Sequence, residues 1–143
     1  MTEVVVEQHI AAAPSVVYRY LTESEKWSLW QGATASLDAK PGGLFSMVMG
    51  NDMNARGQFV ELIPNKLVVF TWGWIDRPGI PPGSTTVRID LSEVVEGTLL
   101  TLTHREVPTD EAAMQKMGWT HYLPRLALVA VGEDPGPDLG PGG

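Results

Sequence analysis

At 143 residues the chain is long enough for one domain, which would bury about two-thirds of the surface of the unfolded chain. A formal net charge of −7 argues against nucleic acid as a partner, and the lack of cysteine excludes disulfides, thiolate catalysis and cysteine zinc sites. No stretch approaches the roughly 18 apolar residues of a membrane span, and the acidic N-terminus does not resemble a signal peptide. We therefore expect a cytoplasmic protein without membrane insertion.

The first thirty residues predict one strand followed by two short helices. Residues 3–10 are rich in Val and Ile, as in a strand. Pro14 suits the first turn of a helix, and a second short helix from residue 22 or 24 would place Trp27 and Trp30 on one side.

From residue 33 to residue 106 apolar and polar residues alternate, which is the period of β-strands. Turns rich in Gly, Pro and Asn divide this stretch, and a longer Gly- and Pro-rich loop covers residues 76–84. The predicted strands are residues 33–39, 44–50, 55–63, 67–75, 85–94 and 98–106. Strands joined by such short turns pair antiparallel, so we expect one antiparallel sheet.

The last predicted element is a helix over residues 109–131, about 33 Å long at the usual rise per residue. Thr109 or Asp110 can cap its N-terminus, and apolar residues then recur three or four apart. Gly118 and Pro124 interrupt the pattern, and we expect a kink or a division into two helices. Such a helix needs a broad concave surface, which a curled sheet supplies. The predicted class is therefore α+β, with the sheet around the helix.

Residues 132–143 read GEDPGPDLGPGG and are almost wholly Gly, Pro and Asp. They hold too little apolar surface to offset the entropy lost on ordering. We assign one domain to residues 1–131 and expect residues 132–143 to form a flexible, dispensable tail.

Short pieces of sequence follow one another in a recognisable order over nearly the whole chain. They are APSVVY from Ala13, EKW from Glu25 with Trp30, PGG from Pro41, GQFVE from Gly57, PNKL from Pro64, VFTW from Val69, and Gly118-Trp119 with Leu123 and Leu126-Ala127. In this order the chain resembles the START-like helix-grip superfamily and, within it, the group named after the activator of Hsp90 ATPase homologue. The resemblance implies a seven-stranded antiparallel sheet wrapped around the C-terminal helix, with a cavity between them. The superfamily includes lipid and hormone carriers, polyketide cyclases and dehydratases, so the fold does not fix the function.

Many aromatic and Met side chains share the faces that would meet the C-terminal helix. A filled core prefers Leu, Ile and Val, whereas Met and Trp often line adaptable ligand surfaces. We therefore expect an apolar cavity, although an ordinary filled core would use the same positions. Its predicted walls are Trp30, Phe45, Met47, Met49, Phe59, Phe70, Trp72, Trp74, Met114, Met117 and His121.

Three polar side chains are candidates for acid–base chemistry in the same space. Histidine ordinarily changes charge near neutral pH, which makes His104 and His121 candidates, and Glu61 lies on the same strand face as Phe59 unless a bulge shifts it. No nucleophile elbow or phosphate-binding glycine loop is present. If the first and last strands pair, as the resemblance implies, His9 lies about 15 Å from His104 at ~3.4 Å per residue. We predict no metal site and no cofactor.

Three functions remain open on the sequence. The first is binding of a hydrophobic or aromatic small molecule in the cavity, by a monomer or a homodimer. The second is a cyclase- or dehydratase-type enzyme in which His104, His121 or Glu61 moves a proton. The third is a regulatory partner-binding domain without a ligand. For the first two we expect access between the 76–84 loop and the helix around residues 114–118.

Overall fold

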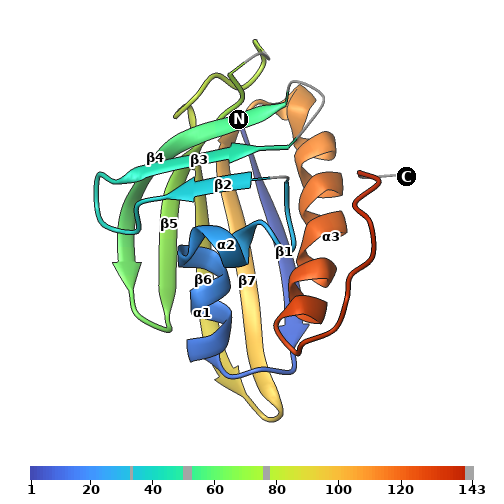
Figure 1. The fold of residues 1–143 in the computed structure, drawn as a ribbon. Coiled ribbons are helices and arrows are strands. Elements are labelled where there is room, and N and C mark those ends of the chain that lie inside the picture. The colour runs from blue at the N-terminus through green and yellow to red at the C-terminus, as the bar shows by residue number, and fades with distance from the viewer. Residues whose placement is uncertain (33, 50–52, 76–77, 141–143) are drawn as a thin grey trace.

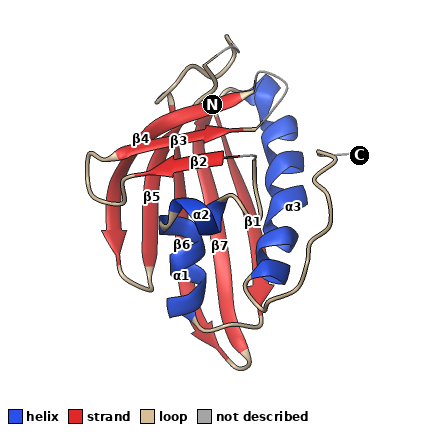
Figure 2. Cartoon of the chain, viewed as in Figure 1, coloured by secondary structure: helices blue, strands red, loops and turns tan. Residues whose placement is uncertain are grey.

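A computed structural model describes residues 1–32, 34–49, 53–75 and 78–140, and the α+β helix-grip architecture is confirmed (Figure 1). Seven strands form one sheet in the order β1-β7-β6-β5-β4-β3-β2, and each neighbouring pair is antiparallel. The strands are β1 (Thr2–Ile10), β2 (Thr34–Leu37), β3 (Leu44–Val48), β4 (Asn54–Ile63), β5 (Leu67–Trp72), β6 (Thr85–Val94) and β7 (Gly97–Val107). The helices are α1 (Pro14–Thr22), α2 (Ser24–Trp27), the 3-10 turn η1 (Thr109–Glu111) and α3 (Ala112–Val129). All of the labelled helices lie on one side of the sheet (Figure 2). None of the described helices is long and apolar enough to cross a lipid bilayer.

The first and last strands lie side by side in the sheet because β1 pairs with β7. Val4 lies opposite His104, and His9 lies opposite Leu99, so the two histidines are five positions apart along the strands. Burial alternates along β7 up to His104, where Leu100, Leu102 and His104 are buried and Leu99, Thr101 and Thr103 are partly exposed, and the alternation ends at the exposed pair Arg105 and Glu106. His9 is exposed, and it does not approach His104.

A β-bulge in β4 changes which residues face the core. Phe59 pairs with Phe70, but Glu61 pairs with Val69, so Val60 is an extra residue in this strand. Phe59 is buried, whereas Val60 is 50% exposed and Glu61 is also exposed. The bulge thereby removes Glu61 from the inner face that its spacing from Phe59 predicts.

The core between α2 and strands β3–β5 is filled by its own aromatic rings. Phe45 stacks on Phe70 with ring centroids 4.2 Å apart, and Trp27 packs edge-on against both rings. Trp30 packs against Trp27 at 4.6 Å, and all four side chains are fully buried. This aromatic cluster leaves little room for a guest on that side of the domain.

Helix α3 is one continuous helix and is not divided at Gly118 or Pro124. Pro124 faces solvent, where water can bond the carbonyl that the proline ring leaves without a partner. The predicted N-cap is absent, because η1 occupies Thr109–Glu111 and no side chain caps either helix start.

The described part of the loop before β6, residues 78–84, is anchored in the core rather than lying wholly on the surface. Ile80 is 1% exposed, and its carbonyl accepts a 2.7 Å hydrogen bond from the Trp74 N–H. The loop backbone comes so close to Gly73 that a Cβ there would lie 1.8 Å from the Pro81 carbonyl oxygen. Glycine at this position therefore permits the anchoring.

Candidate functional site

A cavity of about 490 Å³ lies between the first two-thirds of α3, the end of β5 and the C-terminal segment. Five of the predicted wall residues line it, namely Met49, Trp72, Trp74, Met114 and Met117. The sheet contributes the two indoles, and the helix contributes the two thioethers from the opposite side. The cavity is therefore apolar on both of its main faces.

The other six predicted wall residues do not line this cavity. Trp30, Phe45, Met47, Phe59 and Phe70 are buried at 1% exposure or less, in the aromatic cluster under α2. Met47 accepts a 3.1 Å hydrogen bond at its sulfur from the Trp27 indole N–H, which fixes it in that cluster. His121 lies outside the cavity, in a shallow depression on α3 beside Lys116 and Thr120. The aromatic rings fill their own space, so only the end of the cluster near Trp72 opens into a cavity.

Several wall residues are absent from the sequence prediction. They are Gln31, Met53, Gln115, Gly118, Trp119, Tyr122 and residues 138–140. Two apolar stripes run along α3. Trp119 and Tyr122 lie on the stripe that continues through Leu126, and Met114 and Met117 lie on the adjoining stripe that continues through Leu128. The cavity spans both stripes, so the helical period could have indicated Trp119 and Tyr122.

The helix side of the predicted access route lies at the cavity, since Met114, Met117 and Gly118 line it. The described residues of the 76–84 loop do not line it, and Asp76 and Arg77 lie outside the described residues. Asp138, Leu139 and Gly140 form part of the wall instead. The C-terminal segment thus borders the cavity near α3, and access beside the 76–84 loop stays a prediction.

His104 is fully buried behind the cavity wall and is held in one tautomer. The Trp119 indole N–H, which can only donate, gives a 3.1 Å hydrogen bond to His104 Nδ1. His104 Nε2 therefore carries the proton and donates to Thr85 Oγ1 at 2.7 Å, and the Thr85 hydroxyl donates to the Trp72 carbonyl. Burial lowers the pKa of His104 to about 4. The imidazole is neutral at physiological pH, orients the Trp119 indole and, through Thr85, holds the backbone of Trp72.

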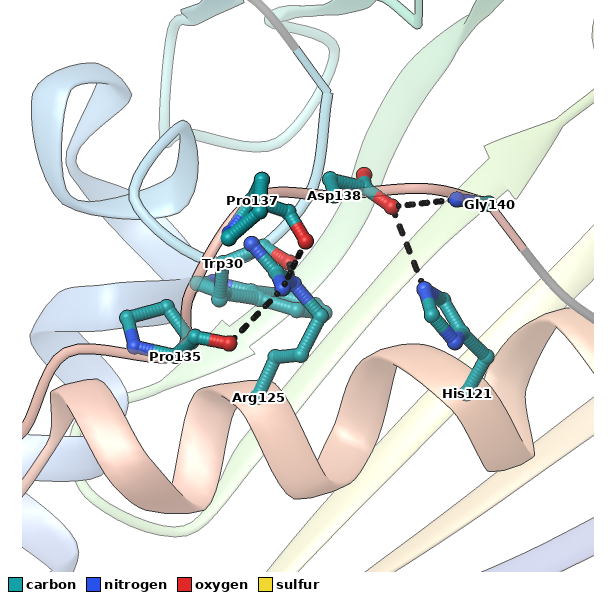
Figure 3. Close-up of polar contacts among 7 residues, drawn as sticks. All are labelled: Trp30, His121, Arg125, Pro135, Pro137, Asp138 and Gly140. Carbon is teal, nitrogen blue, oxygen red and sulfur yellow. Dashed lines mark hydrogen bonds and ion pairs between the residues drawn. The ribbon is translucent and has the colours of Figure 1, made fainter. Parts of the chain in front are cut away.

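Beside α3, Asp138 accepts hydrogen bonds from the helix and from its own segment (Figure 3). Asp138 Oδ1 accepts a 2.9 Å hydrogen bond from the Gly140 N–H and lies 3.1 Å from His121 Nε2. Burial acts to raise the pKa of Asp138, but hydrogen bonds from Gly140, His121 and Tyr122 and the charge of Arg125 lower it overall. Burial, followed by the bond to Asp138, raises the pKa of Tyr122. A carboxylate that already accepts three hydrogen bonds thus borders the cavity.

Arg125 fixes the C-terminal segment along α3 (Figure 3). Its Nη1 donates to the carbonyls of Pro135 at 3.2 Å and Pro137 at 3.4 Å, and its Nε donates to the Trp30 carbonyl at 3.2 Å. Residues 132–140 consequently contact the domain, in contrast to the free tail that their composition predicts. Residues 141–143 lie outside the described residues.

Deleting residues 133–143 should lower the melting temperature. The deletion removes the two carbonyl partners of Arg125 and the carboxylate partner of His121 and Tyr122. A net loss of about 1 kcal/mol corresponds to about 3 °C for a domain of this size. Thermal unfolding of the full chain, the deletion and a control lacking only residues 141–143 measures this. A melting temperature within 1 °C of the full chain would instead make the segment dispensable.

Glu61, the third acid–base candidate, is exposed and does not line the cavity. His104 and His121 do not line it either. The structure thus does not bring the three candidates together. Among the described residues there is also no group of three or more His, Asp and Glu side chains that could hold a metal ion.

Comparison with known proteins agrees with the resemblance seen in the sequence. The human protein "Activator of 90 kDa heat shock protein ATPase homolog 1" is 28% identical over 120 residues, which are 84% of this chain and 34% of that protein. The chain therefore spans about a third of the length of that relative. The structure of an AHSA1-like protein from Rhizobium etli is 42% identical, with a TM-score of 0.76, and the match covers 96% of this chain and 87% of that one.

The fold is shared more widely. The Aha1 dimer from Colwellia psychrerythraea matches with a TM-score of 0.77 at 22% identity, over 89% of this chain and 94% of that one. Residues 11–130 match the family described as "Activator of Hsp90 ATPase homolog 1-like protein". The chain belongs to this family.

Proposed function

We propose that this protein binds an apolar or aromatic small molecule in the cavity between β5 and α3. The observation that carries the proposal is the contrast between the two ends of the aromatic core. Under α2 the buried rings pack against one another, whereas beyond Trp72 a cavity of about 490 Å³ remains. Ligand sites in proteins are concave, mostly apolar and of this size.

The helix side of the cavity suits guests of varying shape. Met114 and Met117 are 42% and 50% exposed, and Met49 and Met53 also line the cavity. Methionine side chains are unbranched and polarisable, so they repack around different guests. A bound apolar molecule would also cover this exposed thioether surface, which favours binding.

Binding is favoured over the cyclase or dehydratase alternative. His104 has both ring nitrogens engaged and is neutral, and neither His121 nor Glu61 lines the cavity. Asp138 borders the cavity, but its carboxylate is already engaged. The third alternative, a partner-binding domain, is weaker because the cavity is not filled by side chains. The described walls come from a single chain, so the proposed binding suits a monomer as well as a homodimer.

Titration with the neutral fluorescent probe N-phenyl-1-naphthylamine tests the proposal. The probe should bind with one-to-one stoichiometry, gain fluorescence and quench tryptophan emission. Met117→Glu places a charge in the apolar wall at a half-exposed position and should weaken binding at least tenfold, or about 1.4 kcal/mol. Lys116→Glu introduces the same group at the adjacent exposed position outside the cavity and should change affinity less than twofold. Equal effects of the two substitutions, or no probe binding, would contradict the proposal.

A further inference from the structure

Three buried side-chain polar atoms lack a hydrogen-bond partner in the described part of the chain: Gln31 Oε1, Trp72 Nε1 and Trp74 Nε1. All three belong to residues that line the cavity. Each of these atoms has less than 1 Å² of accessible surface, so a partner reaches it only when a neighbouring side chain of the wall moves, as the flexible cavity methionines can. Unpaired polar atoms are thus concentrated at this one site.

The remaining tryptophans show that the fold otherwise pairs its indoles. Trp27 donates to Met47 Sδ at 3.1 Å, Trp30 donates to the Tyr20 carbonyl at 3.1 Å, and Trp119 donates to His104 Nδ1 at 3.1 Å. Burying a donor or acceptor without a partner is unfavourable, and folded proteins do so rarely. The exceptions therefore point to a partner that enters the cavity from outside.

We infer that these atoms are the polar part of the binding site, and that the guest is a neutral aromatic molecule with matching polar groups. It would carry an acceptor, such as a ring carbonyl, for the indole N–H of Trp72 or Trp74. It would also carry a donor, such as a phenolic hydroxyl, for the Gln31 amide oxygen. This inference rests on the proposed function, which supplies the apolar part of the recognition.

The charges around the cavity favour a neutral guest over an ion. No lysine or arginine is among the described residues that line it, so an anion would lose hydration without gaining a counter-charge. The only carboxylate in the described wall is that of Asp138, which repels anions. Its attraction for a cation is weakened, because it already accepts hydrogen bonds from Gly140, His121 and Tyr122 and interacts with the Arg125 charge.

A series of ligands on one ring skeleton separates the polar contribution from the apolar one. Fluorene has no hydrogen-bonding group, 9-fluorenone adds a carbonyl acceptor, and 2-hydroxy-9-fluorenone adds a donor. We expect 9-fluorenone to bind at least tenfold more tightly than fluorene, and the hydroxyl to add a further gain. The anion 9-fluorenone-4-carboxylate should bind more weakly than 9-fluorenone.

Conservative substitutions assign the effect to particular atoms. Trp72→Phe or Trp74→Phe removes one indole N–H but keeps an aromatic ring, and at least one of them should bring the fluorene-to-fluorenone ratio of dissociation constants close to one. Trp119→Phe is the matched control, because Trp119 lines the same cavity but already donates to His104, so the ratio should persist. Gln31→Met should abolish only the gain from the hydroxyl. Within each variant, the affinity for fluorene measures any general effect of the substitution on the shape of the cavity or the stability of the domain. The ratio of dissociation constants cancels that effect.

The outcomes separate this inference from the proposed function. Equal affinity of the wild-type protein for fluorene and 9-fluorenone would leave the proposed function standing and overturn the inference, because bound water would then satisfy the three atoms. An unchanged ratio in Trp72→Phe, Trp74→Phe and Trp119→Phe would likewise overturn it. Failure of every ligand in the series to bind would overturn both.

Discussion

Replacement of Gly118 by leucine is expected to abolish binding of N-phenyl-1-naphthylamine while leaving the domain at least as stable as the wild type. Gly118 lines the cavity, and a Cβ built there meets no atom within 4 Å. Its backbone is helical, so replacing glycine in the helix interior favours folding by up to about 1 kcal/mol. The larger side chain would occupy the guest's volume, and we expect at least a 30-fold loss of affinity, or about 2 kcal/mol.

Two further variants show whether the leucine acts by filling the cavity. Gly118→Ala should gain most of the increase in unfolding free energy that leucine gives. It should lower the affinity for the probe only slightly, because one methyl group occupies little of the cavity. Thr120→Leu places the same side chain on the exposed face of α3 and should leave affinity unchanged within twofold. Urea unfolding and probe titration of all three variants provide the comparison. Unchanged affinity in a folded Gly118→Leu protein would place probe binding elsewhere.

Acidification is expected to destabilise the domain through His104. Burial lowers the pKa of His104 from 6.5 to about 4, so between these values the unfolded chain binds a proton that the folded one does not. The stability that depends on neutral His104 is complete above pH 6.5 and is lost progressively as the pH falls toward 4. Between pH 8 and pH 5 the loss amounts to about 2 kcal/mol.

The variant His104→Gln isolates this effect from the other titrating groups. Glutamine does not titrate, although it cannot reproduce both bonds to Trp119 and Thr85. The variant should therefore be less stable at pH 8, but its free energy of unfolding should fall about 2 kcal/mol less than that of the wild type on moving to pH 5. Parallel pH profiles for the two proteins, measured by urea unfolding, would show that His104 is not the group responsible.

The fold was predictable because burial on one face of a sheet imposes alternation along each strand. Strand β6 spans the predicted residues 85–94, and β4 and β7 differ from prediction by one residue at one or both ends. Residues 33 and 50, which the sequence places at strand ends, lie outside the described residues. The continuity of α3 was harder to predict. A proline inside a helix is tolerated where it faces solvent, and whether Pro124 does so depends on how the helix packs on the sheet.

The site was less predictable because alternation does not reveal which inward residues fill space and which leave it open. Phe70 and Trp72 share one face of β5, yet Phe70 stacks on Phe45 while Trp72 borders the cavity. A single extra residue, Val60, moved Glu61 to the outside without a distinctive pattern in the sequence. The C-terminal segment is bound mainly through backbone carbonyls and one carboxylate, so its composition could not show that Arg125 would bind it.

The five indole N–H signals in a nitrogen-15 correlation spectrum test the central claim, that the cavity beside Trp72 and Trp74 binds an aromatic molecule. Single Trp→Phe variants assign the signals. On addition of 9-fluorenone we expect the Trp72 and Trp74 signals to shift most and the cavity-lining Trp119 signal to shift less, because its N–H is already bonded to His104. The signals of Trp27 and Trp30, which are paired within the filled cluster, should stay in place. Saturating ligand that leaves Trp72 and Trp74 unshifted, or shifts only Trp27 and Trp30, would contradict the claim.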